Sequence, residues 1–191
     1  MPADKGNATV ILNTTDYKQK VFSLLVDSTY INLKKDPTES IERKTTKLLK
    51  ISSLPENLRK RLQASGSRAP RLYGLPKIHE EWVPLRPIVS NIGAPTLQLA
   101  KYLTGFLNQL TGKSAHHIKN SAHLTQILDN LQVQPGDLMV SFDMLSLFTK
   151  VPVEDSLSLL SHQFTDILTL FKLVLTSTHV LLCQRSVLRT N

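Results

Sequence analysis

Apolar residues recur every three or four positions in several stretches of the chain, which is the pattern of amphipathic helices. The first stretch follows a Thr15–Asp16 cap, and the second opens at Asp36–Pro37, a cap followed by a proline suited to a first helical turn. Pro55 and Pro152 begin two more of these stretches. The predicted helices cover residues 15–25, 37–49, 55–62, 96–110, 121–131 and 152–164.

Shorter extended runs separate these helices. Residues 7–12, NATVIL, predict a short strand, and residues 71–95 hold four prolines and two glycines that divide them into short extended pieces. We expect these pieces to form a hairpin-like arm whose second strand is RPIVS. After the turn at Pro135–Gly136, residues 137–143 predict a buried strand. Strands and helices in this order indicate an α+β fold rather than regular βαβ alternation.

Composition and charge narrow the function classes. The chain has 191 residues, 41% of them hydrophobic, and its single cysteine, Cys183, excludes an internal disulfide framework. We expect no secretory signal and no membrane span. The formal charge of +8 falls on residues 34–77, which hold twelve Lys and Arg and four acids (12 − 4 = +8). Such a segment indicates a polyanion partner, with a solvated lysine-rich helical surface as the alternative.

A single carboxylate, Asp143, stands at the end of the predicted buried strand. A charge at such a place costs several kcal/mol unless it is paired. One interpretation is a Mg²⁺ ligand, since Mg²⁺ prefers carboxylate oxygens and substrate phosphates. The other is a cap or turn residue. Spacing alone leaves both open.

Cations and aromatic residues are interleaved along the arm. Lys77 and Arg86 each stand beside a proline, and a hairpin could bring both onto one triphosphate, with Arg as a bidentate fork and Lys as a point charge. They could equally be two exposed cations. Tyr73 and Trp82 could stack on bases or pack beneath the arm.

Three motifs occur in an order that resembles one family. RLYGLPKIHE, then PLRPIVSNIGAPTLQLAKYL, then SFDMLSLFTKVPVEDSL are similar to successive motifs of a reverse transcriptase, most of all those of Penelope-like retroelements. The opening ADKGNATVIL also resembles the segment before the fingers in that group. The resemblance runs from about Ala3 to Phe164 and implies a partial right-hand polymerase fold, with fingers and the first part of the palm.

The resemblance also implies roles for individual residues. Asp143 would be the first catalytic carboxylate and, with the carbonyl of Met144, would bind Mg²⁺, of which the complete enzyme uses two ions. Lys77 and Arg86 would contact the phosphates of a deoxynucleoside triphosphate, and Phe148 would exclude a ribose 2′-hydroxyl, with core packing as its alternative. An RNA template and a DNA primer are the implied partners, and the nucleus is the expected location. The residues expected along the nucleic acid are Arg59, Lys60, Arg61, Arg68, Arg71 and Tyr73.

The sequence also departs from the family. The second catalytic strand with its Asp-Asp pair does not occur, and residues 179–191 no longer resemble the group. We therefore expect a truncated element that is inactive as a polymerase by itself; the alternative function is a catalytically dead nucleic-acid-binding fragment. The expected organisation is a basic helical segment (1–70), the fingers arm and its helices (71–135), the start of the palm (136–165) and a divergent tail (166–191).

Overall fold

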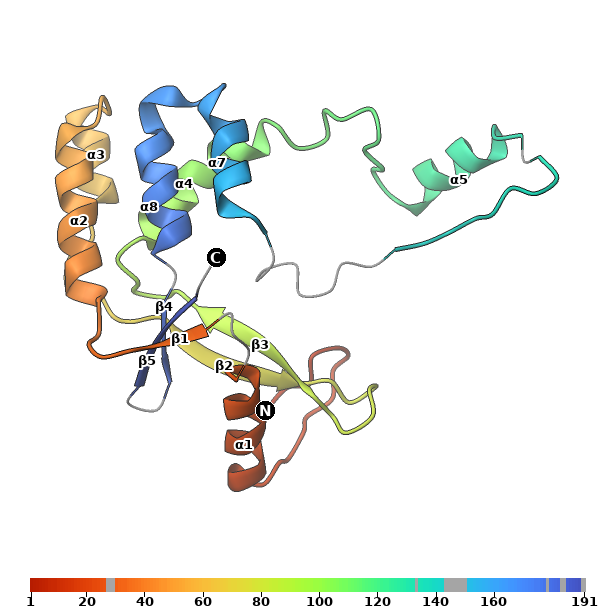
Figure 1. Ribbon diagram of the computed structural model, residues 1–191, viewed down its shortest axis with the longest axis horizontal. Helices are drawn as coiled ribbons and strands as arrows, with labels where there is room; N and C mark the ends of the chain where they lie inside the picture. The colour runs from red at the N-terminus through yellow and green to blue at the C-terminus, as the bar shows by residue number, and fades with distance from the viewer. Residues whose placement is uncertain (27–29, 133, 143–150, 178, 183–184, 190–191) are drawn as a thin grey trace.

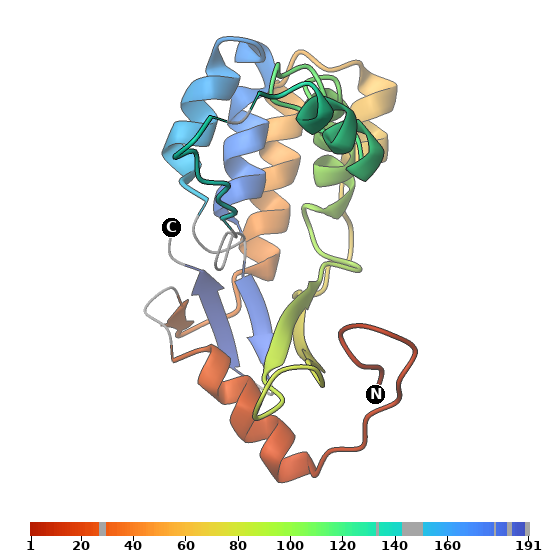
Figure 2. The ribbon, with the colours of Figure 1, turned by 90° about the vertical axis from the view of Figure 1, so that its right-hand side faces the viewer.

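The computed structural model describes residues 1–26, 30–132, 134–142, 151–177, 179–182 and 185–189. A group of helices lies at one end of the molecule, a sheet lies next to it, and helix α1 lies on the far side of the sheet (Figure 1, Figure 2). The mixture of helices and strands confirms the α+β class.

The sheet has five strands in the order β1-β5-β4-β2-β3. All neighbouring pairs are antiparallel except β2 and β4, which pair in parallel through Arg71 and Leu181. The predicted hairpin arm is confirmed as β2 and β3. The strands are β1 (Tyr30–Leu33), β2 (Arg71–Pro76), β3 (Leu85–Ser90), β4 (His179–Leu182) and β5 (Arg185–Arg189).

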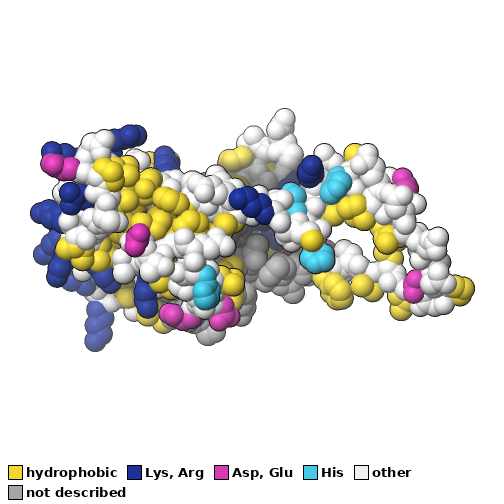
Figure 3. Space-filling model, turned by 90° about the horizontal axis from the view of Figure 1, so that it is seen from above, with side chains coloured by type: hydrophobic (Ala, Val, Ile, Leu, Met, Phe, Trp, Pro, Cys, Tyr) yellow, Lys and Arg dark blue, Asp and Glu magenta, His cyan; other side chains and the backbone are white. Residues whose placement is uncertain are grey.

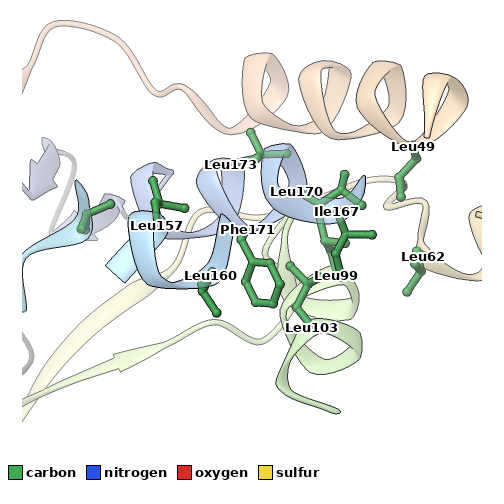
Figure 4. Packing of buried hydrophobic residues seen from close by; sticks show 11 residues of the cluster. Leu49, Leu62, Leu99, Leu103, Leu157, Leu160, Ile167, Leu170, Phe171 and Leu173 are labelled. Carbon is green, nitrogen blue, oxygen red and sulfur yellow. The ribbon is translucent and has the colours of Figure 1, made fainter. Parts of the chain in front are cut away.

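The helical group buries the larger of two cores. Leu99 and Leu170 are almost fully buried at its centre, and Phe171 packs beside Leu103 and Leu160 (Figure 4). The elements are α2 (Thr38–Ile51), α3 (Glu56–Leu62), α4 (Leu97–Asn108), α7 (Val153–Ser161), η1 (Thr165–Ile167) and α8 (Leu168–Thr176). Helices α2, α3, α4 and α7 each begin within three residues of a predicted start, whereas α8 and the short η1 were not predicted.

A second, smaller core joins helix α1 (Thr14–Leu24) to the sheet. Val21 of α1 is buried against Leu72, Leu85 and Val180, which come from three different strands. The hydroxyl of Tyr17 accepts a hydrogen bond from the backbone N–H of Gly74 at 2.9 Å. This core fixes the position of the arm relative to the rest of the sheet.

Helix α5 (Ser121–Asp129) stands apart from both cores (Figure 1). Its predicted existence is confirmed, but none of its residues is buried. The apolar face that was expected to pack is 38–58% exposed at Leu124, Ile127, Leu128 and Leu131, the last of which follows the helix.

The predicted strand at residues 7–12 is wrong. Pro2 and Thr9 form an isolated bridge, and Ala3 and Val10 donate backbone hydrogen bonds to Ala8 and Met1. The segment therefore folds back on the N-terminus instead of joining the sheet. Ile11 is 94% exposed, and Leu12 packs against the smaller core instead of pairing with a strand.

The predicted buried strand at 137–143 is also wrong over its described part, residues 137–142. These residues have no regular structure, and Met139 and Phe142 are 88% and 90% exposed. A strand must pair its backbone N–H and C=O groups, and none of the described strands lies beside this one. Without a partner the apolar sequence does not become a buried strand.

Candidate nucleic-acid and nucleotide interface

One face of the β2–β3 hairpin collects four of the residues singled out from the sequence. Along β2 the side chains alternate, with Leu72, Gly74 and Pro76 buried. Residues of the other parity form the opposite face.

The strand register extends this opposite face to β3. Arg71 pairs with Ser90, Tyr73 with Ile88 and Leu75 with Arg86. The backbone N–H of Lys77 continues the ladder to the carbonyl of Pro84 at 2.9 Å, so Lys77 has the parity of Tyr73. The hairpin face, as we name it, therefore carries Arg71, Tyr73, Lys77 and Arg86.

On the buried face of the hairpin, the side chain of Leu85 lies directly over Gly74 of the neighbouring strand. A Cβ placed on Gly74 would come within 2.7 Å of Leu85 Cδ1, nearer than van der Waals contact allows. Glycine at this position lets the Leu85 side chain fold over β2 and pack toward α1. The tight hairpin in turn fixes the spacing of the cations on its other face.

Both cations of the arm are paired with carboxylates. The ammonium of Lys77 lies 2.9 Å from Glu80 Oε1, and Arg86 Nε lies 2.5 Å from Asp4 Oδ1. The hydrogen bond from Lys77 lowers the pKa of the Glu80 carboxyl, with smaller contributions from the charges of Lys77, His79 and Arg86. Each of the two cations thus has its own carboxylate partner.

The tip of the arm is held by a lysine that the sequence did not single out. Trp82 and Val83 have φ values of 61° and 44°. Lys20, on α1, donates from Nζ to the carbonyl oxygens of both residues, at 2.5 and 3.1 Å. Trp82 is 87% exposed, so it does not pack beneath the arm. Residue spacing offered no signal for Lys20, because its partners lie more than sixty positions away.

Arg59, Lys60 and Arg61 lie on α3 in the helical group, whereas Arg68 lies beside Gly93, just after the end of β3. Arg59 donates to the carbonyl of Lys50 at 2.8 Å and thereby caps the end of α2, while Lys60 pairs with Glu56 at 2.7 Å. Arg61 and Arg68 are exposed. The expected nucleic-acid contacts therefore fall on two separate surfaces.

Helix α2 adds a basic surface of its own. Arg43, Lys47 and Lys50 follow one another at helical spacing and, with Glu42 and Thr46, line a shallow groove of about 300 Å³. Lys and Arg side chains gather over this end of the molecule (Figure 3). The charge count predicted a basic segment here but did not identify which side of the helix would carry it.

The residues expected at the catalytic centre lie outside the described part of the chain. These are Asp143, Met144 and Phe148. In the ranges that the structure describes, no three His, Cys, Asp or Glu side chains gather in a way that could hold a metal ion. The oxygen donors that the sequence offers at Asp143 and Met144 are of the kind that Mg²⁺ prefers.

Comparison of the chain with protein families, curated proteins and solved structures finds no match. Within the described residues no helix is both long and apolar enough to cross a bilayer.

Proposed function

We propose that the chain is the fingers and the beginning of the palm of an RNA-directed DNA polymerase. The observation that carries this proposal is the hairpin face, on which strand register places Arg71, Tyr73, Lys77 and Arg86 side by side. The sequence motifs that resemble a reverse transcriptase supply the same residues independently of the register.

The hairpin face combines the three kinds of group that nucleotide recognition uses. Arg86 and Lys77 supply a fork and a point charge for phosphate oxygens. Tyr73 is 42% exposed and offers a flat ring on which a base can stack, worth roughly 1–3 kcal/mol per base. Arg71, exposed at the start of β2, extends the positive charge along the strand. The basic groove of α2 would follow the phosphates of a template farther along.

The first experiment measures binding of an RNA–DNA primer–template to the full chain as a function of salt. Because phosphate contacts release counterions, we expect the logarithm of affinity to fall linearly with the logarithm of salt concentration. Arg71→Gln should lower affinity and reduce the slope by about one unit. The matched control is Lys101→Gln, which removes an exposed cation from α4, outside both surfaces.

Substitutions of Tyr73 distinguish the contribution of base stacking to affinity from that of phosphate contacts. Tyr73→Ala should weaken binding to a single-stranded template with little change in the salt slope, while Tyr73→Phe should retain the affinity. A flat salt profile, or equal losses for Arg71→Gln and Lys101→Gln, would exclude the hairpin face as a nucleic-acid contact.

A second candidate function is a nucleic-acid-binding fragment without catalytic activity. Residues 137–142 favour it, because the segment that leads to Asp143 is exposed and unpaired rather than part of a sheet. We expect no polymerase activity from the 191 residues alone. Templated primer extension that requires Mg²⁺ and is abolished by Asp143→Asn would contradict this expectation and favour the active enzyme.

A further inference from the structure

Each of the two arm cations is held by a carboxylate of the same chain. Glu80 follows Lys77 by three residues and is exposed, so their pair forms locally within the arm. Asp4 reaches Arg86 from the N-terminal turn, eighty-two positions away. That turn is fixed to the arm because the backbone N–H of Asp4 donates to the carbonyl of Pro76 at 2.9 Å.

The Asp4–Arg86 pair is close but poorly aligned. Its two atoms are 2.5 Å apart, yet the guanidinium Nε–H does not point along a hydrogen bond, and Nε has no hydrogen-bond partner among the described residues. The second oxygen of Asp4, Oδ2, is buried and equally without a partner. The Asp4 side chain is 5% exposed and that of Arg86 is 42% exposed. A buried charge pair that leaves polar atoms unsatisfied is weakly stabilising at best.

We propose that Asp4 and Glu80 are resident counter-ions of a phosphate site, and that a polyphosphate ligand binds by displacing Asp4 from Arg86. This inference rests on the proposed function and adds which side chains neutralise the cations of the same site when no ligand is bound. Phosphate oxygens can meet the guanidinium in line, as the Asp4 carboxylate does not. The displaced Asp4 carboxylate then forms hydrogen bonds with water, which its buried Oδ2 lacks in the ion pair.

The exchange couples ligand binding to the N-terminal turn. With Arg86 held by phosphate, the turn keeps its backbone bond to Pro76 but loses the ion pair that fastens the Asp4 side chain. Ligand binding on the arm is therefore coupled to residues 3–12, the segment whose sequence resembles the region before the fingers.

Tripolyphosphate is the probe, and its affinity for the full chain is measured by calorimetry at low ionic strength. Asp4→Asn removes the counter-ion and should raise affinity by about fivefold or more, since one fewer negative charge competes at close range. Glu81→Gln is the matched control, because it removes a negative charge from the same arm at a residue exposed to solvent, and it reports the long-range effect. Glu80→Gln is a second variant at an exposed position and should raise affinity by a smaller factor.

Arg86→Gln identifies the partner through which Asp4 acts. In that background Asp4→Asn should change affinity no more than Glu81→Gln does. Near-ultraviolet circular dichroism of Trp82, the sole tryptophan, checks that the arm of each variant is folded.

The outcomes separate this inference from the proposed function. If the wild-type chain binds tripolyphosphate and Asp4→Asn matches Glu81→Gln, or weakens binding, displacement of Asp4 is wrong while the phosphate site stands. Weaker binding would show that Asp4 orients the Arg86 side chain for the ligand instead of competing with the ligand for it. If neither the wild-type chain nor the Asp4→Asn and Glu80→Gln variants bind, the phosphate site itself is wrong and the inference fails with it.

Discussion

At the scale of single residues, Lys20 compensates for a strained turn. Trp82 and Val83 both have positive φ, and for a β-branched residue such as Val83 this conformation is unusual. Each such residue costs on the order of 1–3 kcal/mol. The two hydrogen bonds from Lys20 Nζ offset part of that cost, because they fix the carbonyl groups of the same two residues.

Lys20→Met should therefore loosen the tip of the arm. We expect a loss of about 1 kcal/mol in local stability, since an ammonium–carbonyl hydrogen bond that is partly exposed contributes in this range. Amide hydrogen exchange at Lys77 and Val83 measures the local opening. Lys18→Met, at an exposed position on the same helix, is the control. Equal protection of these amides from exchange in the two variants would show that the Lys20 hydrogen bonds do not stabilise the tip.

A second residue-scale feature joins the start of α2 to β4. Asp36 Oδ1 accepts hydrogen bonds from the backbone N–H and the hydroxyl of Thr38, at 2.9 and 2.6 Å, and the Thr38 hydroxyl lies 3.1 Å from Nε2 of buried His179. Burial opposes ionisation of Asp36, but the two bonds from Thr38 and the charge of His179 together hold the pKa of Asp36 below its usual 3.8.

The sign of the resulting pH dependence follows from that direction. A carboxyl whose pKa is lowered by folding adds stability above its unfolded pKa and loses it as the pH falls through the folded value. Asp36→Asn should thus cost up to about 1 kcal/mol at neutral pH, because asparagine keeps an oxygen for the Thr38 bonds but a bond to a neutral acceptor contributes less than one to a charged acceptor. As the pH falls below 3.8 and through the lowered pKa of folded Asp36, the difference from wild type should shrink.

Urea unfolding at neutral pH and at the lowest pH where the chain stays folded measures this difference. Glu39→Gln is the control, because it removes an acid from the first turn of the same helix. A stability difference for Asp36→Asn that stays constant with pH would show that its ionisation is not linked to folding.

At the scale of elements, local sequence signals predicted most helices and the β2–β3 hairpin, but they missed α8 and wrongly predicted strands at 7–12 and 137–142. The apolar spacing of α2 and α4 is local, so residues such as Leu49 and Leu99 mark the buried side from sequence alone. Residues 137–142 have an equally apolar sequence, but a strand also needs a partner, and the sequence of one strand does not reveal which other strand will pair with it.

The hairpin face shows the same contrast within the candidate site. The prolines and glycines of residues 71–95 predicted the hairpin, but only the strand register shows that Tyr73 and Lys77 share one of its faces. The contacts of Asp4 and Lys20 were missed, since each joins residues more than sixty positions apart and no periodicity links them.

The exposed segment 137–142 can be tested directly. The double substitution Met139→Ser and Phe142→Ser should change the free energy of unfolding by no more than about 0.5 kcal/mol, the range of surface substitutions. It should also reduce self-association in light scattering, since it removes two nearly fully exposed apolar side chains.

Leu99→Ala is the matched reference for that experiment. Leu99 is fully buried, so its truncation should cost about 2–5 kcal/mol. If the double variant were destabilised to a similar extent, residues 139 and 142 would be packed in solution and the segment would be a buried strand after all.

At the scale of the whole molecule, the sheet depends on the end of the chain. Strands β4 and β5 lie between β1 and β2, although residues 179–191 lie beyond the segment for which the polymerase function is proposed. Among the residues whose burial the structure describes, the buried members of the helical core end at Leu173. The molecule therefore has a helical core that is complete without the tail and a sheet that requires it.

Ending the chain after Ser177 should separate these two parts. Strand β1 would lose its pairing partner β5, α1 would lose the contact with Val180, and Thr38 would lose His179. Burial of one valine and one buried hydrogen bond together contribute roughly 3 kcal/mol, before any loss of strand pairing. We expect amides of β2 and β3 to lose protection from hydrogen exchange, while those of α4 and α8 retain it.

Val180→Ser in the full-length chain, which perturbs only the smaller core, should lower the protection of α1 and β2 without abolishing it. Equal protection of β2 in the shortened and complete chains would mean that β4 and β5 contribute nothing to the sheet.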